Sequence, residues 1–138
     1  MTGVQTCAFR SLGLLDLTQR RHTVARDCSF GMRKKTALAM ALLHKPKVLL
    51  LDEPFEGIDP ASSAVIEILL GQLSRDGTIL LTSHILSVVQ KLATRVVILH
   101  QGRVESDFDP STADEEVEEV YFSIVGEPQP EVLDWLRP

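Results

Sequence analysis

The sequence predicts an α/β fold in which a parallel sheet is flanked by helices. The apolar run at 48–51 has no polar alternation, which is typical of a strand buried on both faces. Short apolar runs recur at 78–82 and 95–100, and helical patterns separate them. With 44% hydrophobic and 24% charged residues over 138 positions, the composition fits one ordinary globular domain and excludes the disordered and fibrous classes.

Charge is divided unevenly along the chain. Residues 1–104 hold 13 Lys and Arg against 8 Asp and Glu, whereas residues 105–138 hold 1 against 11, which leaves a net charge of −5. The weak positive excess in the body is compatible with a phosphate-bearing ligand, but it is far too weak to argue for nucleic acid, which is not expected as a partner. Two cysteines without metal or disulfide spacing, and no apolar run of about 18 residues, predict a cytosolic chain without direct membrane insertion.

The first eleven residues are predicted to be a non-native leader. Residues 1–11 show no hydrophobic period, and 2–8 resemble the translation of a sequencing-library adapter that continues in 9–11 after loss of one base. In this interpretation neither Met1 nor Cys7 is native. The alternative is an ordinary disordered terminus.

Residues 12–44 are predicted to contain two helical segments. The leucines within 12–17 indicate the end of an amphipathic helix, and the polar, basic stretch 18–27 is interpreted as a loop. A strong helical pattern then runs to the end of the segment, where Pro46 stops it.

The N-terminus of this second helix is a candidate anion site. Ser29 is its expected N-cap. A hydroxyl and a glycine, Gly31, at a helix N-terminus leave backbone N–H groups and the positive end of the helix dipole available. The basic residues 33–35 are expected to reinforce it. Simple capping with a solvated basic face is the alternative, and this segment alone favours it.

Two carboxylates follow the buried strand at once. Ligands of parallel α/β sheets bind beyond the carboxyl ends of the strands, so Asp52 and Glu53 lie at a candidate site. An Asp there can hold Mg²⁺ directly or through water, and a neighbouring Glu can take a proton from an attacking water. The alternative is that these residues and Pro54 only begin a loop. His84 follows the strand at 78–82 and is expected at the same edge, although a lone loop histidine is more often ordinary polar surface.

The following elements have clear boundary signals. Gly57 is expected to take positive φ in a turn, and Asp59 to cap a helix at 60–74 that has Pro at its first position. A further helix at 85–93 leads to a hairpin, 95–108, whose strands meet at a polar residue followed by Gly.

Beyond the hairpin the composition becomes acidic. Residues 109–138 are predicted to form an appended element, with a strand at 117–125 and a short helix at 130–136. The acidic residues are interpreted as a linker or a solvated face rather than a site.

In their order, these motifs resemble the second half of an ABC transporter ATP-binding domain, over residues 12–108. Residues 28–32, Cys-Ser-Phe-Gly-Met, look like the signature motif, usually Leu-Ser-Gly-Gly-Gln, although three of its five positions depart from it. Residues 48–53 look like Walker B, 56–59 like the D-loop, and His84 like the switch histidine. The Gly-Met ending looks most like exporter-type ATPases.

The resemblance implies an ATP-hydrolysing site shared between two subunits. Asp52 would hold Mg²⁺ through water, Glu53 would position or deprotonate the attacking water, and His84 would contact the γ-phosphate. The signature motif would bind the nucleotide held by a second ATP-binding subunit, and the D-loop aspartate would bridge the dimer. The nucleotide-binding residues implied in this way are Ser29, Gly31, Met32 and Asp59.

Two motifs that the resemblance leads us to expect are missing from the sequence. The sequence contains neither the phosphate loop G-x-x-x-x-G-K-[ST] nor a Gln-loop. The expected fold is therefore an incomplete P-loop NTPase (RecA-like) sheet that lacks the Walker A strand between the strands at 78–82 and 95–100, with a C-terminal hairpin and a small appended element. The expected divisions are a leader at 1–11, the end of a helical subdomain with the signature helix at 12–44, the core at 45–108 and the acidic extension at 109–138.

The expected function is ATP hydrolysis that powers transport across a membrane, with ATP and Mg²⁺ as cofactors. The expected partners are a second ATP-binding subunit and a transmembrane permease that keeps the chain at the inner face of the cell membrane; alone, the chain is expected to be inactive. Two alternatives remain. One is an ABC-type ATPase in DNA repair or translation, which an adjacent coiled coil or tandem ATPase half would favour. The other is a non-catalytic dimerisation module that completes a partner's ATP site, which tight binding to an intact ATPase without activity would favour.

Overall fold

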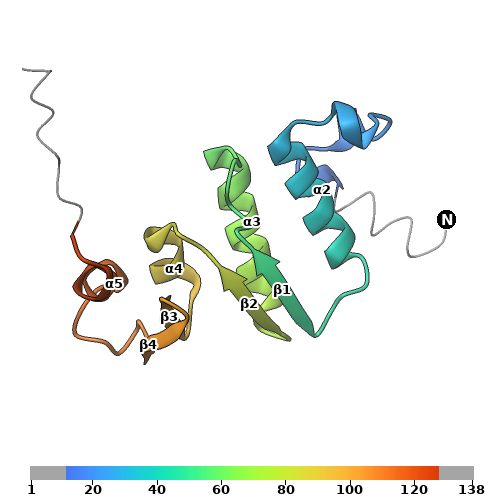
Figure 1. Cartoon of the computed structure of the whole chain (residues 1–138). Helices are drawn as coiled ribbons and strands as arrows, with labels where there is room; N and C mark the ends of the chain where they lie inside the picture. The colour runs from blue at the N-terminus through green and yellow to red at the C-terminus, as the bar shows by residue number, and fades with distance from the viewer. Residues whose placement is uncertain (1–11, 128–138) are drawn as a thin grey trace, which may run out of the picture. The chain divides into compact units, whose positions relative to one another are not determined.

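The computed structural model describes residues 12–127 (Figure 1). The chain divides into two compact units, Met1–His84 and Ile85–Pro138, of which 12–84 and 85–127 are described. The expected leader at 1–11 and the expected helix at 130–136 lie outside the described residues.

The first unit begins with the end of a helix, at 12–14, and two 3₁₀ turns, η1 (Thr18–Arg20) and η2 (Ala25–Asp27). The prediction of a loop at 18–27 was therefore wrong in detail, because i→i+3 backbone hydrogen bonds form single 3₁₀ turns within it. Leu15 and Leu17, which follow the helical residues 12–14, are buried.

Helix α2 (Phe30–Leu42) begins where its sequence predicts. The Ser29 side chain accepts a hydrogen bond from the Met32 N–H at 3.2 Å, which confirms the N-cap. The helix ends at Leu42, two residues before the predicted end, and Lys45 then takes a left-handed conformation with φ of 48°.

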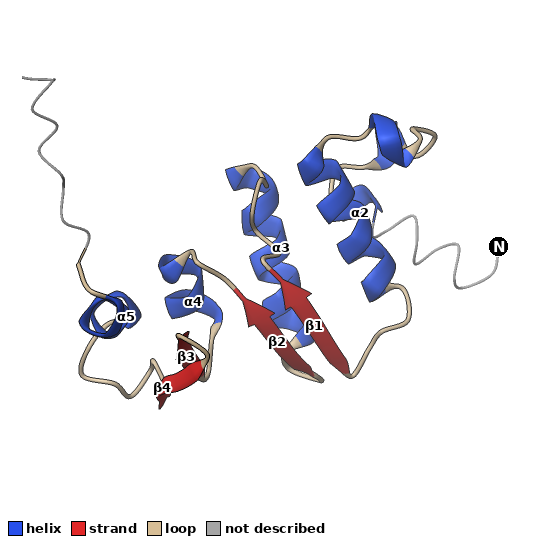
Figure 2. Ribbon diagram, viewed as in Figure 1, coloured by secondary structure: helices blue, strands red, loops and turns tan. Residues whose placement is uncertain are grey.

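Strand β1 (Val48–Asp52) and strand β2 (Thr78–Thr82) form a parallel pair, joined by helix α3 (Pro60–Leu73) (Figure 2). The turn before α3 has Gly57 at φ 68°, and Asp59 caps the helix, both as predicted. Ile66 and Leu70 of α3 and Leu49 of β1 are buried, and so are Leu38 and Ala39 of α2, so these three elements all contribute to the core of this unit.

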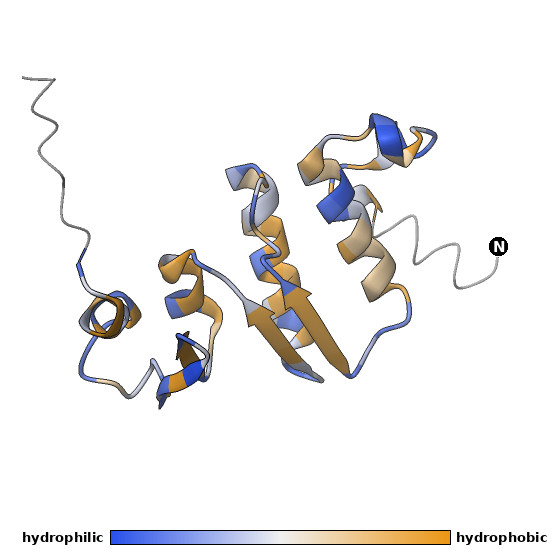
Figure 3. Ribbon diagram, in the orientation of Figure 1, coloured by the Kyte–Doolittle hydropathy of each residue, from blue (hydrophilic) through white to orange (hydrophobic). Residues whose placement is uncertain are grey.

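The opposite face of β1 and β2 is open in the described part of the chain. Both strands are strongly apolar (Figure 3), but Val48, Leu50 and Leu80 are 62%, 69% and 64% exposed, whereas Leu49 is 7% exposed. The expectation of strands buried on both faces was therefore wrong for these residues. Burial of both faces requires covering elements on each side, and the described residues place core side chains against one side only.

Within the described residues, β2 pairs with β1 alone. Its other edge therefore carries backbone groups without a strand partner among the described residues.

The second unit contains helix α4 (Leu86–Leu92), strand β3 (Val96–His100), strand β4 (Arg103–Phe108) and helix α5 (Val117–Val125). The hairpin prediction is confirmed: β3 and β4 pair antiparallel, and the two turn residues take φ of 48° and 78°, as a tight hairpin turn requires.

Helix α5 corrects the predicted strand at 117–125. Its N-terminus carries a capping box, in which Glu116 and Glu119 each bind the other's backbone. Val117, Val120 and Ile124 recur at helical spacing and pack on the core formed by Val96 and Ile98. A short apolar run is compatible with the periodicity of a strand and with that of a helix. Here the capping box and the packing on the core stabilise the helix.

No helix among residues 12–127 is both long and apolar enough to span a bilayer.

Candidate active site at the carboxyl edge of the parallel strands

The candidate site is built by the parallel register of β1 and β2. Asp52 is the register partner of Thr82, so both strands end at the same level. Glu53 follows the end of β1 directly, His84 follows the end of β2 after Ser83, and their side chains meet. The expectation that His84 lies at the same edge as the two carboxylates is confirmed, because parallel strands present their carboxyl ends together.

Thr82 links the two carboxylate residues through its hydroxyl group. It donates a hydrogen bond to Asp52 Oδ1 at 2.5 Å and accepts one from the Glu53 N–H at 3.1 Å. Sequence reasoning did not single out Thr82, because its role depends on the strand register. The position before the Ser-His pair at the end of a strand was the available signal.

The side chains of Glu53 and His84 form the central contact of the site. Glu53 Oε2 lies 2.9 Å from His84 Nδ1 and 3.4 Å from the His84 backbone nitrogen. The Glu53 side chain is 30% exposed and that of His84 is 67% exposed, so both can be reached from solvent. One carboxylate oxygen is held by the histidine, and the other can accept a proton from water.

Lys34 of α2 approaches the same loop from the other side. Its ammonium group donates to the Glu53 carbonyl oxygen at 2.6 Å and to Glu56 Oε2 at 2.9 Å. The hydrogen bond and the charge of Lys34 lower the pKa of the Glu56 carboxyl below its usual value. Lys34 also lies 4.8 Å from the centre of the Phe30 ring.

The expected reinforcement of the helix N-terminus by residues 33–35 needs correction. Lys34 binds the loop after β1, and Lys35 is 9% exposed, donates to the Ser62 hydroxyl at 3.1 Å and lies 3.8 Å from Asp59. These two charges are turned toward their own chain. Lys34 and Lys35 lie in the second turn of α2, which has a side facing its own chain as well as one facing solvent, and the sequence alone did not tell the two sides apart.

The signature-like residues lie at the N-terminus of α2. Ser29 and Met32 are joined by the capping bond, and a Cβ atom at Gly31 would come within 2.6 Å of the Gly57 carbonyl oxygen. Glycine at position 31 therefore allows α2 to pack closely on the turn before α3.

Asp59 lies at the end of that turn. It accepts a hydrogen bond from the Ser62 N–H at 2.9 Å, and this bond lowers the pKa of the Asp59 carboxyl. Its side chain remains 57% exposed and is therefore accessible from solvent.

The described residues contain no cluster of three or more side chains that could hold a metal ion by themselves. Asp52 uses one carboxylate oxygen for Thr82, which leaves the other for a ligand. One carboxylate oxygen fits Mg²⁺, which commonly keeps several waters and takes its remaining ligands from substrate phosphates.

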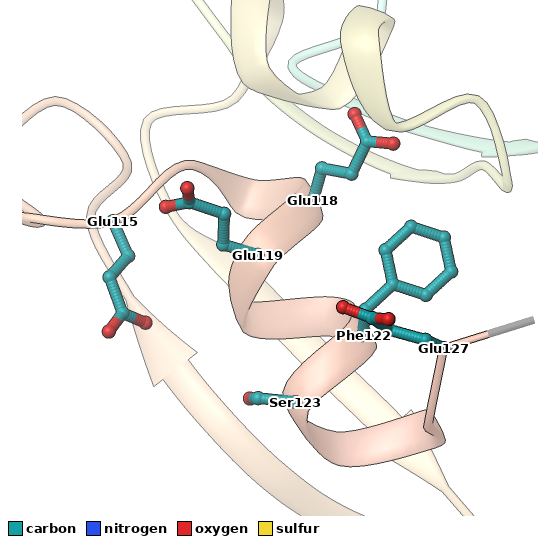
Figure 4. Close-up of a pocket in the computed structure, with 6 residues that line it drawn as sticks. All are labelled: Glu115, Glu118, Glu119, Phe122, Ser123 and Glu127. Carbon is teal, nitrogen blue, oxygen red and sulfur yellow. The ribbon is translucent and has the colours of Figure 1, made fainter.

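A separate cavity of about 630 Å³ lies on the second unit (Figure 4). Its carboxylates are exposed, which fits their interpretation as a solvated helix face. The side chains that line it are Glu115, Glu118, Glu119, Phe122, Ser123 and Glu127.

Comparison with known proteins gives one family match and many relatives. Residues 5–90 match the family model described as "AAA domain, putative AbiEii toxin, Type IV TA system". The ABC transporter ATP-binding protein YdbJ of Bacillus subtilis is 34% identical over 87% of this chain and 39% of its own length. The Nod factor export ATP-binding protein I of Rhizobium leguminosarum bv. viciae is 38% identical over 98% of the chain and 44% of its own length. The bacitracin transport ATP-binding protein BcrA of Enterococcus faecalis is 32% identical over 74% of this chain and 34% of its own length.

Solved structures agree with this assignment. An ATP-binding subunit of an ABC transporter superposes with a TM-score of 0.80 at 25% identity, over 88% of this chain and 54% of that chain. A dimeric ATP-binding cassette in a post-hydrolysis state, bound to ADP and Pi, superposes with a TM-score of 0.71 at 25% identity, over 80% of this chain and 49% of that chain. The chain spans less than half the length of these curated relatives. It belongs to the AAA-domain family, and it is a homologue of ABC transporter ATP-binding proteins with their P-loop NTPase fold.

Proposed function

We propose that this chain is part of an ATP-hydrolysing subunit of an ABC transporter, which powers transport across a membrane through a partner permease. The observation that carries this function is the contact between Glu53 and His84, beside Asp52, at the carboxyl edge of the parallel strands. Two of the relatives are named for bacitracin transport and for Nod factor export, which supports a transport role.

Each residue at this edge has a role in phosphoryl transfer. Asp52 holds Mg²⁺ through water, using the carboxylate oxygen that Thr82 leaves available. Glu53 positions or deprotonates the attacking water, and His84 orients the Glu53 carboxylate and contacts the γ-phosphate. Catalysis of this reaction is mostly positioning and charge stabilisation, and a general base contributes about 10² to 10⁴ in rate.

The N-terminus of α2 serves a nucleotide held by a second ATP-binding subunit. The Ser29 hydroxyl accepts the capping bond from Met32, and its own proton is free to be donated to a phosphate oxygen. The backbone N–H groups of the first turn of α2, that of Gly31 included, donate to the anion. Asp59, which is exposed, bridges toward the second subunit. The dimeric neighbour bound to ADP and Pi supports pairing with a second ATP-binding subunit. In our proposal the permease keeps both subunits at the inner face of the membrane.

The function is tested in a chimaera, because the sequence contains no phosphate loop and the chain alone should hydrolyse no ATP. Residues 12–127 replace the matching part of the Enterococcus faecalis BcrA protein, and ATP turnover is measured. We expect turnover that Glu53→Gln lowers at least 100-fold. The matched control, Glu105→Gln on β4, should leave it unchanged. A folded chimaera whose turnover does not depend on Glu53 contradicts the proposed function.

A further inference from the structure

Glu53 has a backbone conformation that its residue type disfavours. Its φ is 45°, in the left-handed region, where a Cβ atom crowds the following carbonyl group. A non-glycine residue stays there only when its surroundings hold it. The surroundings here are specific: the peptide group on each side of Glu53 makes a hydrogen bond to a side chain from another element.

On the N-terminal side the Glu53 N–H donates to the Thr82 hydroxyl of β2 at 3.1 Å. On the C-terminal side the Glu53 carbonyl accepts from the Lys34 ammonium of α2 at 2.6 Å. The ammonium group is itself fixed, because it also binds the Glu56 carboxylate and lies over the Phe30 ring. The Lys34 side chain is only 21% exposed, so water competes weakly for its donors.

We propose that Lys34 is a positioning residue for the Glu53 carboxylate, and that Thr82 completes the clamp from the neighbouring strand. With both flanking peptide groups held, rotation about the Glu53 backbone is restricted and the side chain leaves the loop in one direction. That direction brings Glu53 Oε2 to 2.9 Å from His84 Nδ1. Lys34 itself touches the carbonyl and not the carboxylate, so it acts through the backbone of the proposed base. This role rests on the proposed function of Glu53.

The clamp is tested on the full 138-residue chain by NMR, without nucleotide. The readout is the change that Glu53→Gln causes in the ring nitrogen shifts of His84, assigned by their absence in His84→Gln. In the wild-type background the change should be large, because the carboxylate at Nδ1 is replaced by an amide. The same comparison is then made in a Lys34→Met chain, which keeps the aliphatic part of the side chain and removes the donor. There Glu53→Gln should cause less than one third of the shift change that it causes in the wild-type chain. Lys34→Arg, which restores a cationic donor, should recover at least half of it.

Lys47→Met is the matched control, since Lys47 also donates to a backbone carbonyl, that of Asp76, at 3.4 Å. It should leave the response of His84 complete. A folded Lys34→Met chain with an undiminished response overturns the clamp. If that variant does not fold, the comparison is made in Thr82→Val and Thr82→Ser chains. Glu53→Gln should no longer change the His84 shifts in the Thr82→Val chain and should still change them in the Thr82→Ser chain. A Thr82→Val chain with the full change overturns the clamp. The readout needs no ATP, so a folded chimaera whose turnover does not depend on Glu53 would contradict the proposed function and leave the clamp standing.

Discussion

Replacement of Gly31 by alanine should destabilise the chain, although alanine favours helices. A Cβ atom at this position would lie 2.6 Å from the Gly57 carbonyl oxygen and 3.8 Å from Ile58 Cδ1. The oxygen belongs to the backbone of a turn and cannot rotate away, so α2 or the turn must move. Overpacking of this kind typically costs about 1–3 kcal/mol, and the helix propensity of alanine returns at most about 1 kcal/mol. We expect a net loss of about 1 kcal/mol.

Gly71→Ala on α3 is the matched control. Gly71 also lies within a helix, but a Cβ atom there would meet nothing within 4 Å. Alanine should therefore stabilise the chain, by about 0.5–1 kcal/mol. The two variants should differ by about 2 kcal/mol, which corresponds to ~8 °C in Tm for a domain of this size. Thermal and urea unfolding followed by circular dichroism measure the difference. A Gly31→Ala chain as stable as the Gly71→Ala chain would refute the close packing of α2 on the turn.

Substitutions at three further positions test the capping and burial of the first unit. Ser29→Ala removes the side-chain cap of α2 and should cost about 1 kcal/mol in urea unfolding, whereas Ser29→Thr should cost less. The pKa of the Asp59 carboxyl is lowered in the folded state, so its stabilisation is complete above the ordinary value of 3.8 and is lost as the pH falls through the lower folded value. Unfolding midpoints between pH 6 and pH 2.5 should therefore fall less steeply in Asp59→Asn, and an unchanged slope would count against the Ser62 contact. Leu80→Thr on the exposed strand face should change stability by less than about 0.5 kcal/mol and reduce self-association in sedimentation; a large loss would mean that Leu80 is buried.

Local signals in the sequence were sufficient for most element boundaries. Ser29 and Asp59 start their helices because their side chains satisfy free N–H groups, and this chemistry needs no tertiary information. The hairpin turn follows from Gly102 and its polar neighbour in the same way. The placement of His84 beside Glu53 could be predicted because strand ends in a parallel sheet lie at one edge.

Features that depend on packing partners could not be predicted. Whether Leu50 is buried depends on whether another element covers its face of the sheet, and the sequence of the strand does not contain that information. The period of 117–125 was ambiguous until the cap at Glu116 and the core under the helix were known. The contact of Lys34 with the Glu53 carbonyl joins residues 19 positions apart, and only the packing of α2 against the loop after β1 brings them together.

The central claim is that Glu53 and His84 form the hydrolytic end of an ATP site. The most direct test is ATP turnover of the BcrA chimaera with Glu53→Gln, and with Glu105→Gln as the control. We expect the first variant to retain nucleotide binding and to lose at least 100-fold in turnover, while the control keeps full turnover. Equal turnover in both variants, with the chimaera folded and ATP bound, would contradict the assignment of this edge of the sheet as the active site.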